Sequence, residues 1–221
     1  MTTAKIVPIV LIVHIFFGAF GLTAGTLALF INKTLKLHKI AGKVFFYSML
    51  GIFLTSIYMS LVSGNLFLLL VGFFSFYLAA TGYRILFLKR LHVAIIKPKL
   101  LDYLIVATGV ISGIAIIGLG VFLFSKGNMF WVVSCSFGLV SIGLGYKDAI
   151  KFKHPPTDKT HWIKSHASRM AGAYTATVTA FIVVNIQMAN GWILWILPAL
   201  IIIPTSQKIV NKFLAPHKKS I

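Results

Sequence analysis

Long apolar runs separated by short polar segments dominate the sequence. Each run approaches the roughly 20 residues that a helix needs to cross the hydrocarbon core of a bilayer. The pattern therefore predicts an all-α integral membrane protein with seven transmembrane helices. Their expected ranges are 6–31, 41–63, 66–86, 101–124, 129–146, 168–187 and 192–206.

The composition agrees with this pattern and excludes a soluble domain. Hydrophobic residues make up 58% of the chain and charged residues only 11%, and the mean hydropathy is +0.94. Because the spans occupy most of the 221 residues, residues 1–221 are expected to form a single transmembrane helical bundle. The only cysteine, Cys135, lies in an apolar run, which excludes a disulfide framework and a cysteine-based metal site.

The basic residues predict how the helices are oriented. All of them except Lys5 and Lys126 lie after the first, third, fifth or seventh expected span. Cytoplasmic connections are enriched in lysine and arginine, so the N-terminus is expected outside and the C-terminus in the cytoplasm. The net charge of +18 is thus assigned to anionic lipid at the cytoplasmic face and not to nucleic acid. The basic and apolar segment 84–100 predicts an amphipathic helix at that interface.

Two segments of the chain resemble each other at an offset of 63 residues. Residues 64–84 align without a gap on residues 127–147. This similarity predicts a parallel duplication of a helical hairpin, and the alternative is chance similarity between two apolar helices. The recurring positions are Gly64, Asn65, Phe67, Phe74, Gly82 and Tyr83, matched by Gly127, Asn128, Phe130, Phe137, Gly145 and Tyr146.

Candidate chemistry gathers where two expected spans begin at the cytoplasmic side. His38 and Gly42 are four residues apart at the start of the second span, and His166 and Met170 are four apart at the start of the sixth. Residues at this spacing share a helix face. Two imidazoles opposed across a bundle are the axial ligands that a b-type haem needs. His38 and His166 are therefore predicted haem ligands, and the alternative is that they hydrogen-bond helix ends or lipid phosphates.

A second interpretation of the same region is a divalent metal site. His161 and Asp148, which precede His166 in the sequence, would supply further nitrogen and oxygen ligands beside His38 and His166. Asp148 also ends the fifth span, where the helix dipole is unfavourable to a carboxylate. It is therefore expected to pair with a cation, either Arg169 or Lys164. Asp102, at the start of the fourth span, is expected to cap that helix.

His14 lies deeper, in the first expected span. It shares a helix face with Gly18, Gly21 and Gly25. These glycines offer a smooth surface for a flat ring, or they serve close helix packing, since two of them form a GxxxG pair. Ionisable residues inside a membrane usually have a role, so His14 is expected to be an auxiliary ligand or a proton carrier. Tyr83, Arg84 and Tyr174 are expected to line the mouth of the haem site.

The runs HIFFGAFGLTAGTLALF, LHKIAGKVFFYSML, TGYR and HWIKSHASRMAGAYTATVTAFIVVN carry a resemblance to known sequences. Together they resemble a family of bacterial multi-pass membrane proteins of the "domain of unknown function" type. This resemblance implies a multi-helix protein of the bacterial inner membrane and no particular activity. A weaker likeness is to cytochrome b561-like and ferric-reductase-like bundles, in which His-x-x-x-Gly helices hold haem. This chain differs from them because it lacks a second, mid-membrane histidine pair.

The expected function is therefore binding of a b-type haem, or a similar redox centre, for electron transfer at the cytoplasmic end. A redox partner or a second copy of the chain would be the protein partner, and no catalytic residues are identified. One alternative is a small-molecule or ion transporter, whose path would pass His14 and the polar stripe Ser48, Gly51, Thr55 and Tyr58. The other is a membrane interaction subunit without chemistry of its own.

Overall fold

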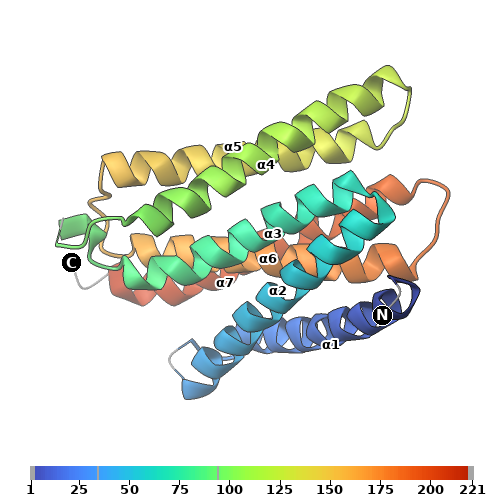
Figure 1. Cartoon of the computed structure of the whole chain (residues 1–221). Coiled ribbons are helices and arrows are strands. Elements are labelled where there is room, and N and C mark those ends of the chain that lie inside the picture. The colour runs from blue at the N-terminus through green and yellow to red at the C-terminus, as the bar shows by residue number, and fades with distance from the viewer. Residues whose placement is uncertain (1–2, 34, 94, 219–221) are drawn as a thin grey trace.

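The computed structural model describes residues 3–33, 35–93 and 95–218, and the regular structure in these ranges is entirely helical (Figure 1). The α-helices are α1 (Thr3–Phe30), α2 (Lys36–Ser63), α3 (Leu66–Arg84), α4 (Leu100–Ser125), α5 (Trp131–Lys153), α6 (His161–Asn185) and α7 (Leu197–Lys218). Three short 3-10 helices are η1 (Ile85–Phe87), η2 (Leu91–Val93) and η3 (Gly191–Trp195).

In the described part of the chain, six helices are long and apolar enough to cross a membrane: all the α-helices except α5. This finding confirms an all-helical, multi-pass membrane protein whose apolar helix faces contact lipid. Helix α5 has 23 residues, but its last two turns carry several charged side chains, which lower its hydropathy. The count of seven spans thus depends on α5 alone. The charged residues of its last two turns are Lys147, Asp148, Lys151 and Lys153.

The helices pack as two hairpins on either side of a central group (Figure 1). Helices α4 and α5 form one hairpin, α1 and α2 form the other, and α3, α6 and α7 lie between them. Helix α3 contacts both α2 and α4, so the two hairpins meet on it, and α6 contacts α1, α3 and α7. Functional side chains on α6 can therefore reach partners on several helices.

Small residues bring α4 and α5 into backbone contact. A Cβ atom added to Gly138 would lie 2.7 Å from the carbonyl oxygen of Gly113, and one added to Gly113 would lie 3.0 Å from that of Gly138. The hydroxyl of Ser141 donates a 2.6 Å hydrogen bond to the carbonyl of Gly109 across the same contact. Small residues and interhelical hydrogen bonds replace the hydrophobic effect as the source of helix association in lipid. This hairpin is thus a rigid support for the charged residues at its end.

The two copies of the suspected repeat have the same turn geometry. Gly64 and Gly127 have φ values of 66° and 67°, in the left-handed region that only glycine adopts without strain. In each copy an asparagine side chain then accepts a backbone N–H: Asn65 from Leu68, and Asn128 from Phe130. Matched aromatic rings also touch each other, with centroids 4.8 Å apart for Phe67 and Phe130 and 5.8 Å for Phe74 and Phe137. These features agree with a duplication, which stays a prediction.

The prediction of an amphipathic helix over 84–100 is wrong. The connection between α3 and α4 instead contains the two short helices η1 and η2. Ile85, Leu88 and Leu91 point into the bundle and are buried. Their apolar side chains cover the ends of α3 and α6 and do not lie on the lipid surface. The connection therefore forms a lid over the end of the bundle.

Candidate functional site

Polar side chains converge at one end of the bundle, which is formed by the connections 31–35, 85–99 and 154–160. We call this the basic end; it lies at the left of Figure 1. Helices α2 and α6 begin there at Lys36 and His161, earlier than the expected starts at residues 41 and 168. Both starts bring a predicted ligand into a helix, His38 on α2 and His166 on α6.

His38 is held by the end of α1. Its Nδ1 donates to the carbonyl oxygen of Ala28 at 3.0 Å. The last carbonyls of an α-helix have no partner within the helix, so Ala28 has an oxygen to offer. The ammonium of Lys33 donates to the same oxygen at 2.8 Å and to the carbonyl of Leu29, and burial lowers the pKa of Lys33. Because a carbonyl only accepts, Nδ1 carries the imidazole proton and Nε2 keeps the lone pair.

His166 is held in the same way by α3. Its Nδ1 donates to the carbonyl oxygen of Gly82 at 2.7 Å. Glycine is needed there, because a Cβ at position 82 would lie 2.9 Å from Cβ of Arg169 and 3.2 Å from the backbone nitrogen of Met170. The close approach of α3 and α6 therefore makes this bond possible. Again Nε2 is the ring nitrogen with the lone pair.

The structure brings the two predicted ligands to one region. His166 lies within electrostatic range of His38 and of the ammonium groups of Lys33 and Lys89. Tyr83, which follows Gly82, stacks on Phe46 of α2 with ring centroids 4.2 Å apart. His38 of α2 and His166 of α6 therefore lie at the same end of the bundle, both within electrostatic range of Lys33.

Two other predicted residues, Tyr174 and Met170, have structural contacts of their own. The hydroxyl of Tyr174 is 2.7 Å from that of Thr26, and its ring covers Gly25, where a Cβ would lie 2.4 Å from the ring. Met170 packs against the apolar core. Both side chains therefore join α6 to its neighbours further inside the bundle than His166.

His14 is not close to the other two histidines. Its Nδ1 is 2.8 Å from the hydroxyl oxygen of Thr55, which itself donates to the carbonyl of Gly51. His14 is therefore the donor to Thr55. Fourteen helical residues, or about 21 Å at 1.5 Å per residue, separate His14 from Ala28, whose carbonyl holds His38. The pair His14–Thr55 forms a separate polar contact within the spans.

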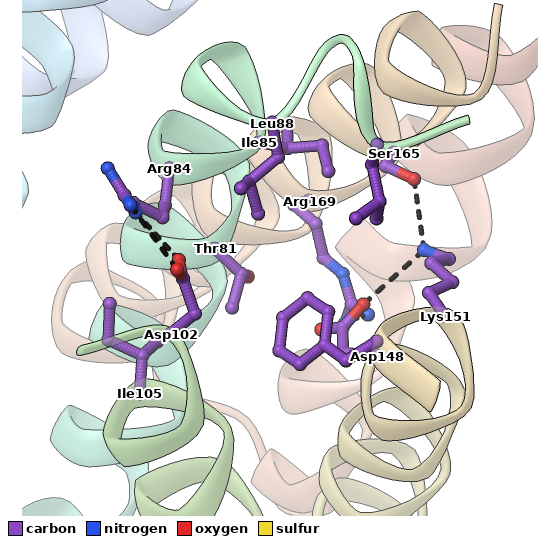
Figure 2. A pocket seen from close by; sticks show the side chains of 12 residues that line it. Thr81, Arg84, Ile85, Leu88, Asp102, Ile105, Asp148, Lys151, Ser165 and Arg169 are labelled. Atoms are coloured by element: carbon purple, nitrogen blue, oxygen red, sulfur yellow. Dashed lines mark hydrogen bonds and ion pairs between the residues drawn. The ribbon is translucent and has the colours of Figure 1, made fainter. Parts of the chain in front are cut away.

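Asp148 is the centre of a charged cluster at the basic end (Figure 2). It accepts from Nη2 of Arg169 at 2.8 Å, from the hydroxyl of Tyr77 at 2.9 Å and from the ammonium of Lys151 at 3.3 Å. The predicted pairing with Arg169 is confirmed. The other candidate, Lys164, instead binds the exposed Asp158 at 2.6 Å. Sequence reasoning missed Tyr77, because its hydroxyl is the only polar part of a residue in an apolar run.

A second ion pair joins α3 to α4. Asp102 accepts from the backbone N–H of Lys99 at 2.7 Å, which confirms its predicted capping role. Arg84 also binds it through two bonds, from Nε at 2.6 Å and from Nη2 at 3.2 Å. The guanidinium of Arg84 is therefore bound to Asp102. Arg84 is one of the residues predicted to line the mouth of the haem site. No sequence pattern indicates this pair, since the two residues belong to different helices.

The candidate metal ligands His161 and Asp148 have other partners. His161 is buried, with Nε2 3.3 Å from the carbonyl oxygen of Lys89. Its ring centroid is 5.9 Å from that of His92. Within residues 3–33, 35–93 and 95–218 there is no group of three or more histidine, cysteine or acidic side chains that could hold a metal ion.

No protein-family model matches the chain, and neither a curated protein nor a solved structure is significantly similar to it. The functional assignment therefore rests on the geometry of the site.

Proposed function

We propose that the protein binds a b-type haem at the basic end and transfers electrons through it. His38 and His166 would hold the iron, each through Nε2. A single observation carries this proposal: both imidazoles donate Nδ1–H to a backbone carbonyl, at Ala28 and at Gly82. A metal-ligating histidine almost always has its other nitrogen held in this manner, which fixes the tautomer and the ring orientation.

The donor set fits a haem. Two imidazoles would suit a six-coordinate haem iron, and here they come from two different helices, α2 and α6. Lys33 and Lys89 supply ammonium groups close to His166, which suits two propionates. Tyr83 and Phe46 offer an apolar wall. When bound, the haem supplies one-electron redox chemistry, and these residues orient it and exclude water.

The proposal includes an orientation. The basic end faces the cytoplasm of a bacterium, and the N-terminus lies outside. Helix α5 then also crosses the membrane, paired along its length with α4, and brings the number of spans to seven. The alternating distribution of basic residues supports this orientation, and anionic lipid at the inner leaflet would contact the basic connections. A reporter fused after Ile221 should read cytoplasmic, and one inserted at Gly127 should read external. A cytoplasmic signal from Gly127 would contradict the orientation.

The haem proposal is tested by one spectrum. Protein purified from haem-replete cells should show a Soret band and, after reduction with dithionite, the sharp bands of six-coordinate b-type haem. His38→Ala and His166→Ala should each abolish or strongly weaken these bands, because one remaining imidazole cannot supply both axial positions. His154→Ala is the matched control, since His154 is exposed at the end of α5. Size-exclusion profiles of all variants separate loss of haem from loss of folding.

A colourless protein that also fails to take up added hemin would contradict the haem proposal. The contact of His14 with Thr55 then favours transport of a small molecule or ion, because these residues begin a polar path in the spans. Reconstituted vesicles would show uptake that His14→Ala abolishes. A protein with neither spectrum nor uptake would be an interaction subunit.

A further inference from the structure

A narrow crevice opens at the basic end between α3, α4, α5 and α6, separate from the two histidines. Figure 2 shows Arg84 and Asp102 on one side, Lys151 and Ser165 on the other, and Arg169 with Asp148 between them. The cavity volume is about 20 Å³. A cavity of roughly 10–15 Å³ holds one water molecule, so this one accepts a single small group.

The charges around this crevice do not balance. Its described lining has the three cations Arg84, Lys151 and Arg169 but only the two carboxylates Asp102 and Asp148. Arg84 and Asp102 neutralise each other through their two hydrogen bonds. Arg169 likewise neutralises Asp148. One positive charge, that of Lys151, is left over in a half-buried position.

Arg169, which lines this crevice and whose guanidinium lies over the ring of Tyr77, has one donor without a hydrogen-bond acceptor among the described residues. The residue is 4% exposed, and its Nη2 donates to Asp148 and to the carbonyl of Leu144. Its Nη1 is buried and has no hydrogen-bond partner in the part of the chain that the structure describes. A buried donor without an acceptor is costly, so an acceptor at this point would stabilise the protein.

The carboxylate of Asp148 does not stand in the way of such an acceptor. Its Oδ2 already accepts from Tyr77 and Arg169, and its Oδ1 accepts from Lys151. Lys151 also donates to the hydroxyl oxygen of Ser165 at 3.0 Å. That hydroxyl keeps its own proton for a further acceptor.

We propose that this crevice binds one small monovalent anion, either chloride or the carboxylate of a small acid. The anion accepts from Nη1 of Arg169, from Lys151 and from the hydroxyl of Ser165, and it neutralises the surplus charge. A water molecule could satisfy Nη1 but would leave the charge unbalanced. Sulfate carries two negative charges, one more than the surplus of the lining, and is therefore a poorer match than a monovalent anion. The proposal does not depend on the haem.

The test is thermal unfolding of the full chain in detergent, followed by tryptophan fluorescence. Sodium sulfate is replaced stepwise by sodium chloride at constant ionic strength, and a second series uses sodium acetate. We expect a saturable rise of a few degrees in melting temperature with one or both monovalent anions. A rise with chloride alone assigns a halide site, and a rise with acetate alone assigns a carboxylate site.

Variants separate site binding from general salt effects, which act on all variants alike. Lys151→Gln and Ser165→Ala should each remove or weaken the saturable component. Lys147→Gln, an exposed position on the same helix, should retain it. Identical anion dependence in Lys147→Gln and Lys151→Gln would overturn the proposal. So would a wild-type curve without saturation, which would indicate that water alone fills the crevice.

Discussion

Two polar groups of residues lie at the basic end, and they are built in opposite ways. In the charged cluster around Asp148, side chains bind side chains, from α3, α5 and α6. In the histidine pair, each imidazole binds only a backbone carbonyl through Nδ1, at Ala28 and at Gly82. The cluster uses its polar atoms to join helices, whereas Nε2 of each histidine has no hydrogen-bond partner in the part of the chain that the structure describes.

This difference assigns a supporting role to the charged cluster and, under the haem proposal, a ligand-binding role to the two histidines. Ion pairs that are shielded from water fix the relative positions of the helices that carry them, because removal of either partner leaves a buried charge. Arg169 is three residues from His166, so the cluster also fixes the turn of α6 on which His166 lies. The comparison predicts that changes in the cluster alter stability, while changes at the histidines alter what the protein binds.

The largest effect on stability is expected for Asp148→Asn. The substitution leaves Arg169, which is 4% exposed, without its negative partner. Breaking a buried pair costs about 3–5 kcal/mol, and less where water reaches the site. Thermal unfolding in detergent measures the loss. Asp158→Asn is the matched control, because its partner Lys164 is half exposed. An equal melting temperature for Asp148→Asn and wild type would mean that the cluster does not support the bundle.

Gly82→Ala should have a smaller effect on stability and a distinct effect on His166. The added methyl group would meet Cβ of Arg169 at 2.9 Å and the backbone of Met170 at 3.2 Å. Overpacking of this kind costs about 1–3 kcal/mol, and separation of α3 from α6 lengthens the bond from His166 to the carbonyl of residue 82. We expect a lower melting temperature together with a weaker haem spectrum. Gly143→Ala is the control, since a methyl group there meets open space.

The sequence predicted the helices well because an apolar run of spanning length has few other structures open to it in a bilayer. It also predicted that Asp148 pairs with a cation, either Arg169 or Lys164, because the helix dipole is unfavourable to a carboxylate at the end of α5; the structure selects Arg169. It did not reveal Tyr77 or the carbonyl of Gly82. Their contacts are 71 and 84 residues away along the chain and depend on how closely α3 crosses α5 and α6.

The connection between α3 and α4 is a second part of the structure that could not be predicted from the sequence. Its mixture of apolar and basic residues suits either an interfacial helix or a lid, and periodicity does not distinguish the two. Leu88 and Leu91 are 2% and 1% exposed, because the ends of α3 and α6 leave an apolar surface to cover. Only the tertiary arrangement provides that surface.

Tyr77→Phe should change stability less than either previous substitution. It removes one of the three donors to Asp148 and leaves the ring, which is buried against Gly109. A hydrogen bond to a charged group contributes about 1.5–3 kcal/mol, and a typical one about 0.5–1.5 kcal/mol. Because Arg169 and Lys151 still bind the carboxylate, we expect the free energy of unfolding to fall by about 0.5–1.5 kcal/mol. Chemical unfolding measures it, and the haem spectrum should stay unchanged. Loss of the spectrum would show that the cluster and the histidines act as one site.

The smallest effect is expected for the exposed pair of Asp158 and Lys164. The bonds from Lys164 and Thr160 hold the pKa of Asp158 well below its ordinary value. A carboxyl whose pKa is lowered by folding stabilises the folded protein above its unfolded pKa, about 3.9, and this contribution disappears as the pH falls toward the folded pKa. Exposed pairs contribute at most about 1 kcal/mol. Wild type should therefore melt slightly above Asp158→Asn at pH 7, and the difference should shrink below about pH 4 and vanish only as the pH falls below the folded pKa. If the difference in melting temperature instead grows as the pH falls, the predicted direction of the pH dependence is wrong. The pair of Asp158 and Lys164 would then contribute more than an exposed ion pair.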